Sequence, residues 1–326
     1  MKKRKFGSFH WKVSEIGLGT WAMGGGWGKQ SEQESISTIL KAVEQGIDFI
    51  DTALIYGDGK SEKLIGKGLK LLGNPSSIKI ASKIPPLQGY WPPHSYENCA
   101  DRYPEKYLRE SVEKSLSHLR IDCLDLMQLH TWNRAWNKNP EALEVLHALK
   151  KEGKIKAVGI STPEQDQNAC NDLIKEGRID SLQVIYNIFD QEASAEIFDL
   201  AMQHEVAIIV RCALDEGSLT GKFSKKTQFE KGDWRKNFFR GDRLKEVVKR
   251  VEKIKKDLET INPKSSENLA STALKFILRE KAVSTVITGA RNSSQIESNA
   301  SSSESKALSD LEFERLLKHA WRRYFW

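Results

Sequence analysis

The stretch SEQESISTILKAVEQGIDFIDT, residues 31–52, contains one complete unit of helix followed by strand. Its first four residues, Ser31-Glu-Gln-Glu34, form a capping box, which predicts that a helix begins here. Apolar residues then recur at helical spacing across 36–43, and Gly46 stands where the helix is expected to end. The apolar run Phe49–Thr52 follows and predicts a short buried strand.

Units of this kind continue along the chain in both directions. Short apolar runs predict strands at Ile16–Thr20, Phe49–Thr52, Ile78–Lys83, Leu124–His130, Ala157–Ser161, Leu182–Ile185, Val206–Val210 and Ser284–Thr288. Strand and helix alternating in this way over roughly 280 residues indicate an α/β fold of the (β/α)8 or TIM barrel class. We expect residues 6–13 to form an N-terminal hairpin that closes the barrel bottom, and the C-terminus to add an extra helix and tail.

Helix signals and loop lengths add detail to this prediction. Pro104 suits the first turn of a helix, and Thr162-Pro-Glu-Gln165 predicts an N-cap and a helix start after the fifth strand. Three segments exceed the usual connection of ~4–6 residues, and each follows a strand, so all should lie on the face where barrels build active sites. These long loops are Pro85–Tyr103, Thr131–Asn139 and Arg211–Arg243. Without a linker or an internal repeat, residues 1–326 are expected to form one domain.

Composition excludes several classes of protein. With 39% hydrophobic residues the chain is too apolar to be intrinsically disordered, and 326 residues can bury a large core. No apolar run reaches the ~18 residues of a membrane span, and the basic start lacks the apolar segment of a secretory signal. The cysteines Cys99, Cys123, Cys170 and Cys212 are far apart, which argues against disulfides or a zinc site and favours a cytoplasmic location.

The net charge of +7, from 51 basic and 44 acidic residues, is modest and spread along the chain. Its densest part, Lys245–Lys256, has apolar residues at helical spacing and predicts a helix with a solvated basic face. The alternative is a surface that binds nucleic acid or membrane, but we expect neither partner. A mildly basic protein also suits a small polyanion such as a phosphorylated cofactor.

A glycine-rich turn, Gly17-Leu-Gly-Thr-Trp-Ala22, follows the first predicted strand and is similar to the dinucleotide-binding fingerprint. The next helix begins only near Ser31, so no helix N-terminus would meet a pyrophosphate there. We therefore do not expect a Rossmann-type site at this turn.

Four polar residues fall at or just beyond the ends of three consecutive strands. They are Asp51, Tyr56, Lys83 and His130. A phenol with a pKa near ~10 is a weak acid at neutral pH. A nearby ammonium should lower that pKa, a carboxylate should hold the ammonium charged, and a neutral imidazole can donate to a carbonyl oxygen. Together the four residues predict a site that protonates an oxygen as hydride arrives at carbon.

At these residues the sequence resembles the aldo-keto reductase family, in family order over nearly the whole chain. The matching segments are Gly17-Leu-Gly-Thr-Trp21, Asp51-Thr-Ala-Leu-Ile-Tyr-Gly57, Ser61-Glu62, Lys83, Leu126-Met-Gln-Leu-His130, Gln183, Tyr186-Asn187, Gly217-Ser-Leu-Thr-Gly-Lys222, Gly289-Ala-Arg291, Gln295 and Asn299. The resemblance implies a (β/α)8 barrel that binds NADP(H) in extended form and reduces a small aldehyde or ketone to an alcohol. It implies Tyr56 as general acid, Lys83 and Asp51 as the pair that tunes it, and His130 as the residue that orients the carbonyl.

The resemblance also implies a set of cofactor contacts. They are Gly19, Thr20, Trp21, Asp51, Ser161, Thr162, Gln183, Arg211, Leu214, Glu216, Gly217, Ser218, Gly289, Arg291, Gln295 and Asn299. Gln183 and Ser161 match residues that bind the nicotinamide carboxamide, residues 214–218 would wrap the pyrophosphate, and Arg291 favours NADP(H) over NAD(H) through the 2′-phosphate.

Three positions depart from the family pattern. Thr162 stands where an asparagine is usual and has only a hydroxyl where the amide offers a donor and an acceptor. Gln295 stands where an arginine is frequent. Arg211 replaces a common tyrosine, and it would either stack on the nicotinamide or pair with a loop carboxylate.

Aromatic residues are candidates for the substrate pocket. Trp21, Trp91 and Trp132 lie at a strand end and in long loops, although some of these rings would simply pack the loops. The C-terminal segment 321–326 could fold over the barrel mouth. His94 and Arg134 are candidate anchors for a polar substrate, with exposed surface residues as the alternative.

Two other functions compete with the carbonyl reductase. One is a cofactor-sensing regulatory subunit of the same fold, against which the complete set of four catalytic residues argues. The other is a metal-dependent hydrolase, which needs histidine and carboxylate ligands clustered at strand ends. Because His130 alone among seven histidines ends a predicted strand, we expect no metal site. The physiological substrate, the reaction direction and the oligomeric state stay open.

Overall fold

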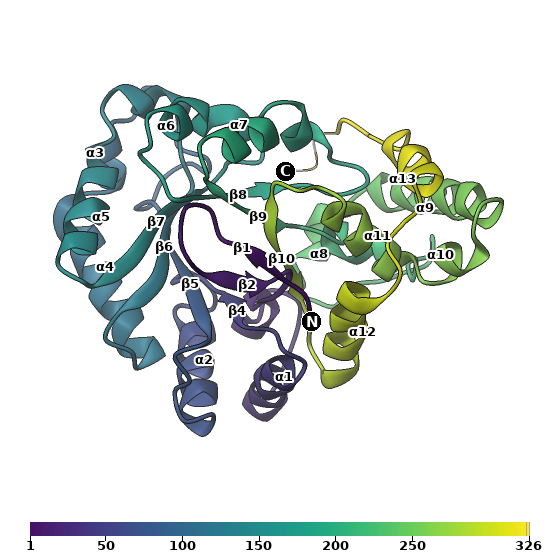
Figure 1. The fold of residues 1–326 in the computed structure, drawn as a ribbon, viewed down its shortest axis with the longest axis horizontal. Coiled ribbons are helices and arrows are strands. Elements are labelled where there is room, and N and C mark those ends of the chain that lie inside the picture. The colour runs from purple at the N-terminus through teal and green to yellow at the C-terminus, as the bar shows by residue number, and fades with distance from the viewer. Residues whose placement is uncertain (324, 326) are drawn as a thin grey trace.

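The barrel is built from eight parallel strands that close on themselves (Figure 1). The computed structural model describes residues 1–323 and 325. The strands, in their order around the barrel, are β10 (Val283–Gly289), β3 (Ile16–Gly19), β4 (Phe49–Asp51), β5 (Lys79–Ile84), β6 (Leu124–His130), β7 (Ile155–Ser161), β8 (Ser181–Ile185) and β9 (Ala207–Arg211). Pairing of β9 with β10 closes the ring. The predicted barrel is confirmed, and each predicted strand overlaps an observed one with ends that differ by at most two residues.

Helices surround the barrel and cover its outer face (Figure 1). They are α1 (Glu32–Glu44), α2 (Lys60–Leu71), α3 (Cys99–Arg102), α4 (Glu105–Leu119), α5 (Glu141–Lys151), α6 (Asn171–Lys175), α7 (Ile197–Gln203), α8 (Arg235–Phe238), α9 (Arg243–Glu259), α10 (Pro263–Glu267), α11 (Leu269–Leu278), α12 (Ser293–Glu304) and α13 (Asp310–Leu317). Short 3-10 helices are η1 (Trp21–Gly24), η2 (Arg134–Lys138), η3 (Gln167–Cys170), η4 (Glu192–Ala195) and η5 (Asp215–Thr220). In the described part of the chain, no helix has the length and apolar character to cross a bilayer.

Several helix predictions are confirmed and one is wrong. The capping box of Ser31 and Glu34 starts α1, and the basic segment forms α9 with its apolar face buried. Pro104 occupies the N-cap of α4, one place before its first turn. No helix starts at Thr162, because its hydroxyl and its amide both donate to the carbonyl of Gln183 instead of capping a new turn.

An N-terminal hairpin closes the bottom of the barrel, as predicted, but it extends from Lys3 to Ser14 and so begins before the expected residues 6–13. It consists of β1 (Lys3–Lys5) and β2 (Lys12–Ser14), which pair in antiparallel register. The connecting loop inserts Phe6 against Phe49 of β4, with ring centroids 5.6 Å apart, and both rings are buried. The hairpin therefore plugs the end of the barrel opposite the C-terminal ends of the strands.

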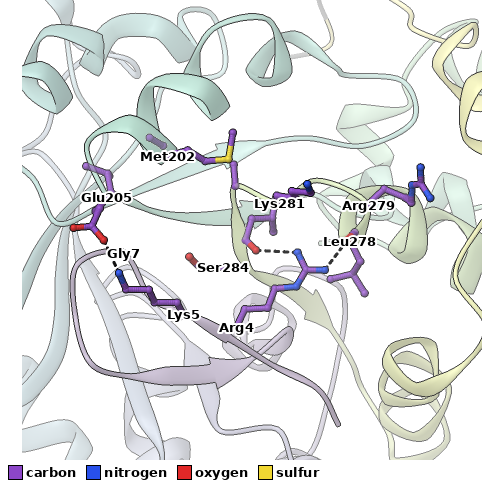
Figure 2. Close-up of a pocket in the computed structure, with 13 residues that line it drawn as sticks. Arg4, Lys5, Gly7, Met202, Glu205, Leu278, Arg279, Lys281 and Ser284 are labelled. Atoms are coloured by element: carbon purple, nitrogen blue, oxygen red, sulfur yellow. Dashed lines mark hydrogen bonds and ion pairs between the residues drawn. The ribbon is translucent and has the colours of Figure 1, made fainter.

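Arg4 anchors this plug. Its guanidinium donates to the carbonyl oxygens of Leu278, Glu280 and Val283 and pairs with Glu15, so it binds the end of α11 and the start of β10. Figure 2 shows the contact of Arg4 with Leu278. An open pocket of about 460 Å³ lies beside it, and none of its lining residues is a predicted site residue. The predicted site residues lie at the other end of the barrel, on the C-terminal ends of the strands.

The turn after β4 depends on close backbone packing. Gly57 has φ +64°, and a Cβ added to it would lie 2.4 Å from the carbonyl oxygen of Gly24. This contact presses the turn that bears Tyr56 against η1, the short helix after β3. Only glycine fits this approach without moving the backbone.

We expect Gly57→Ala to lower the free energy of unfolding by roughly 3 kcal/mol or more, because it adds a backbone clash to the cost of a left-handed φ. Gly73→Ala is the control, since Gly73 has φ +76° but nothing within 4 Å of an added Cβ. The control should lose only about 1–2 kcal/mol. Urea denaturation measures both, and equal losses would contradict the importance of the Gly24 contact.

Candidate active site

The four predicted catalytic residues lie together at the C-terminal ends of the strands. Asp51 ends β4, Lys83 lies on β5, His130 ends β6, and Tyr56 stands in the turn after β4. The ammonium of Lys83 lies 2.5 Å from Asp51 Oδ1 and donates to Tyr56 Oη at 3.2 Å. The rings of Tyr56 and His130 are 6.0 Å apart and nearly perpendicular. We call these residues the tetrad.

Asp51 connects the tetrad to the next part of the barrel wall. Its Oδ2 accepts hydrogen bonds from Gln183 Nε2 at 2.8 Å and from Gln128 Nε2 at 3.4 Å. Lys83 also donates to the carbonyl of Thr52 at 2.8 Å. Both members of the ion pair are therefore solvated by protein groups in place of water, although each is almost completely buried.

The pKa values of Lys83 and Tyr56 show why the ion pair between Lys83 and Asp51 matters. Burial alone would lower the pKa of Lys83, but Asp51 and Tyr56 together outweigh this effect, so the net pKa of the ammonium is raised and Lys83 stays charged. Burial raises the pKa of Tyr56, and the nearby Lys83 offsets only part of that increase. Lys83 thus acts on the phenol in the expected direction, but burial has the larger effect and the net pKa of Tyr56 is raised. Tyr56 keeps its proton at neutral pH, which a proton donor requires.

His130 is a neutral imidazole. Burial, followed by the positive charges of Lys83 and Arg211, holds its pKa well below the ordinary value. Its buried Nδ1 has no hydrogen-bond partner among the described residues. The exposed ring of Trp91 stands edge-on to it, with centroids 5.1 Å apart. The imidazole can therefore offer an N–H to a ligand that enters beside Tyr56.

The predicted cofactor residues at the first and fifth strands lie on the same face. Gly19 ends β3, and Thr20 follows with its hydroxyl donating to the carbonyl of Asp51 at 2.9 Å. Ser161 ends β7 and is in register with Gln183 of β8. Gln183 uses one N–H of its amide on Asp51, so its carbonyl oxygen and its second N–H are the groups that it can offer to a ligand.

Arg211 resolves the alternative that the sequence left open. It ends β9 and pairs with Glu164 at 3.0 Å, and the same nitrogen donates to the carbonyl of Thr162. Burial would lower the pKa of Arg211, but Glu164, Cys212 and Tyr56 together outweigh this effect, so its pKa is raised. In the free protein Arg211 thus forms the loop salt bridge with Glu164.

The predicted pyrophosphate loop, residues 214–218, is tightly folded. Asp215, Glu216 and Gly217 all have positive φ, between +49° and +92°. The Cys212 thiol donates to Glu216 Oε1 at 3.6 Å, while Glu216 Oε2 is buried without a partner among the described residues. Burial therefore raises the pKa of Glu216 to about 7 and that of Cys212 to about 12.

The remaining predicted cofactor residues gather where β10 meets α12. The backbone N–H of Arg291 donates to Gln295 Oε1, and Asn299 Nδ2 approaches the carbonyl of Gly289 at 3.5 Å. The guanidinium of Arg291 also donates to the carbonyl of Lys29, which ties this junction to the loop after β3. Gln295 therefore braces the junction through its own amide.

The aromatic predictions have mixed outcomes. Trp21 lies beside the tetrad, with its ring centroid 6.4 Å from that of Tyr56, and Trp91 is 44% exposed next to His130. Trp132 has no exposed surface and donates to Asn137, so its assignment to the pocket wall is wrong and it packs its loop. Arg134 is occupied by an ion pair with Asp166.

The C-terminal segment lies partly outside the described residues, because Tyr324 and Trp326 are not among them. The described part packs on the C-terminal face of the barrel: the backbone N–H of Trp321 donates to the carbonyl of Phe189, which follows β8. Among the described residues, no cluster of histidine, cysteine, aspartate and glutamate is suited to hold a metal.

Sequence reasoning missed two residues of this face. Gln128 lies two positions before His130 on β6, so strand alternation could have placed it on the same inner face. Arg235 pairs with Asp233 and stacks over the ring of Trp27, 4.6 Å from its centroid, which joins the loop after β9 to the loop after β3. No sequence motif marks that contact.

The buried carboxyl of Glu216 predicts a pH-dependent stability. Because its pKa is 4.5 when exposed and about 7 in the folded protein, the folded state binds the extra proton between these values and loses stability as the pH rises through them. In wild type, the free energy of unfolding should fall by an amount on the order of 3 kcal/mol as the pH rises from 4.5 to 7, and we expect this fall to be absent in Glu216→Gln. Urea unfolding of the ligand-free protein at pH 5 and pH 8 measures this difference.

Glu312→Gln is the contrasting control. Hydrogen bonds from Ser265 and Ser309 outweigh burial and lower the pKa of Glu312 to about 2. Removing that carboxylate should therefore destabilise the protein at pH 8, opposite in sign to Glu216→Gln. A pH profile of Glu216→Gln that parallels wild type would show that Glu216 does not titrate in this range.

Comparison with known proteins agrees with this architecture. A sequence model of the aldo/keto reductase family matches residues 15–320. The chain is 34% identical to the aldo-keto reductase YhdN of Bacillus subtilis over 88% of this chain and 84% of that protein. It is 30% identical to the NADH-specific methylglyoxal reductase of Escherichia coli, covering 92% of each. The holo structure of aldo-keto reductase AKR11C1 from Bacillus halodurans superposes with a TM-score of 0.76 at 27% identity, over 98% of this chain and 96% of that one. The chain therefore belongs to the aldo/keto reductase family of oxidoreductases.

Proposed function

We propose that the protein is an NADP(H)-dependent carbonyl reductase that converts a small aldehyde or ketone into an alcohol, with Tyr56 as the general acid. The observation that carries this proposal is the series of hydrogen bonds from Asp51 through Lys83 to Tyr56, with the His130 ring 6.0 Å from that of Tyr56. Hydride addition leaves negative charge on the former carbonyl oxygen. The series of hydrogen bonds ends at the Tyr56 hydroxyl, which can donate a proton to that oxygen.

The proton is held by Tyr56 and released under the influence of Lys83. A phenol with a raised pKa keeps its proton until the carbonyl oxygen becomes alkoxide-like and accepts it. The phenolate that forms is then 3.2 Å from a permanently charged ammonium, which stabilises it in a buried setting. Asp51 keeps that ammonium charged, so its role is indirect.

His130 would orient the carbonyl. A neutral imidazole donates one N–H without competing for the proton of Tyr56, and its lowered pKa keeps it neutral throughout the neutral pH range. Trp91 and Trp21 border this place from two loops, which suits a substrate with an apolar part next to its carbonyl.

The residues present fit a dinucleotide. Gln128 Oε1, His130 Nδ1 and Arg211 Nε are buried on this side of the barrel without partners among the described residues, and buried polar groups are normally satisfied. When bound, the nicotinamide supplies the hydride. Gln183 and Ser161 would hold the carboxamide, with Thr162, Arg211, Thr20 and Gly19 around the ring.

The rest of the dinucleotide would follow the loops at the strand ends. Residues 214–218 would hold the pyrophosphate, and Gly289, Arg291, Gln295 and Asn299 would surround the adenosine and its 2′-phosphate. Arg291 supports NADP(H), but the name of one relative specifies NADH, so coenzyme choice needs its own test.

We expect Tyr56→Phe to reduce turnover below about a tenth of wild type while NADPH affinity changes by less than about threefold, because the phenol supplies the proton and not the cofactor site. Lys83→Met should also lose turnover, but it leaves the buried Asp51 carboxylate without its partner, so a lower melting temperature is expected as well. Loss of NADPH absorbance with a panel of aldehydes and ketones measures turnover, and tryptophan fluorescence measures binding.

Tyr107→Phe is the matched control, since its hydroxyl donates to the carbonyl of Pro85 and does not touch the tetrad. It should retain wild-type turnover. Turnover of Tyr56→Phe above about a tenth of wild type would remove Tyr56 from the acid role.

Coenzyme preference is expected to depend on Arg291. If it reads the 2′-phosphate, Arg291→Ala should lose about 1.5–3 kcal/mol of NADPH affinity, or about 10- to 150-fold, with NADH little affected. Gln30→Ala is the control, because the Gln30 side chain donates to the Arg291 carbonyl and braces the same junction without a charge. Equal losses for both coenzymes would mean that Arg291 only supports the loop.

A further inference from the structure

The C-terminal tail, residues 318–323 with Phe325, is attached to two loops at the cofactor face. Trp321 donates its backbone N–H to the carbonyl of Phe189 at 2.8 Å, and their rings pack edge to face with centroids 5.6 Å apart. Phe189 is buried in the loop after β8. The neighbouring Asn187 donates to the carbonyl of Cys212, so this loop is tied to the loop after β9.

Arg323 connects the tail to the turn at residues 215–218, through a contact with Asp215. Its guanidinium binds both carboxylate oxygens of Asp215, the first residue of η5, and the two side chains are 7% and 1% exposed. The rings of Phe189, Trp321 and Phe325 surround the guanidinium at 4.9–5.3 Å. Burial lowers the pKa of Arg323 to about 10, so it is still a cation at neutral pH.

Asp215 needs such a partner because of its backbone. It has φ +49° and is followed by Glu216 at φ +53°, conformations that cost a non-glycine residue about 1–2 kcal/mol each. Strained residues of this kind persist only when their surroundings hold them. Asp215 Oδ2 also accepts the hydroxyl of Ser218 at 2.5 Å, so the carboxylate spans the turn from its first residue to Ser218.

We propose that Arg323 is a positioning residue for the cofactor: through Asp215, the C-terminal tail holds the 215–218 turn in the shape that receives the pyrophosphate. This inference rests on the proposed function, which places the pyrophosphate at that turn. Coupling between two sites is reciprocal, so a tail that strengthens cofactor binding must itself be held more firmly when the cofactor is bound.

The first test is the NADPH affinity of Arg323→Gln, measured by tryptophan fluorescence. We expect the dissociation constant to rise about tenfold, because the variant leaves the buried Asp215 carboxylate without its partner. Arg323→Lys keeps the charge but loses the bidentate contact, so its NADPH dissociation constant should lie between those of wild type and Arg323→Gln.

Arg279→Gln is the matched control. Arg279 pairs with Asp310 at 2.7 Å and lies over the ring of Phe313; this is also a pair of arginine and aspartate beside an aromatic ring, but it is more exposed and does not touch the turn. It should leave the NADPH dissociation constant within about twofold of wild type, as for a partly exposed pair. Melting temperatures of both variants show whether each one folds.

A double-mutant cycle separates positioning from general destabilisation. If Arg323 acts through Asp215, then Asp215→Asn combined with Arg323→Gln should weaken NADPH binding no more than the worse single variant does. Additive losses, or unchanged binding in Arg323→Gln and Arg323→Lys, would overturn the proposal. Tighter binding in these variants would overturn it as well.

Hydrogen exchange provides the reciprocal readout. NADPH should slow exchange of the Trp321 backbone amide in wild type, and the slowing should disappear in Arg323→Gln. If wild-type protein binds NADPH but the exchange rate of the Trp321 amide does not change, the positioning role of Arg323 is wrong while the proposed function stands. A wild-type protein that does not bind NADPH at all would instead remove the proposed function.

Discussion

The buried ion pair between Lys83 and Asp51 is the interaction on which the rest of the site depends. Asp51 is in register with Ala81, two residues before Lys83, so closing the barrel between β4 and β5 places both side chains on the inner face. An ammonium without exposed surface is tolerated only because the carboxylate and the Thr52 carbonyl replace water. Loss of either partner would leave an uncompensated charge, so fold and site are stable only together.

Segments far apart in sequence brace one another around this pair. The backbone of Trp234, after β9, donates to the carbonyl of Gly26, after β3, and the guanidinium of Arg291 holds Lys29 from the β10 side. The Arg323–Asp215 pair adds the C-terminal tail to the same face. Such loops have few strand hydrogen bonds of their own, so their shape depends on these cross-contacts.

Much of the fold could be predicted because its signals are local. Mostly apolar runs mark all the barrel strands, since a parallel strand covered on both faces is largely apolar. The tetrad could also be placed, because strand ends of a barrel meet on one face. The prediction of a helix start at Thr162 failed because a capping pattern forms a cap only when no other group binds its residues. Here Thr162 donates to the carbonyl of Gln183 in the neighbouring strand, and Arg211 pairs with Glu164.

What the sequence determined by itself was the barrel, its strand order and the residues that gather at its C-terminal face. The tertiary structure alone decided that Trp132 packs inside, that burial raises the pKa of Tyr56 despite Lys83, and that Arg323 pairs with Asp215, 108 residues away. The periodicity of apolar residues is set by residues close together in the sequence, so it can be recognised from the sequence alone. Desolvation and charge pairing depend on which groups are buried together once the chain has folded, so they cannot.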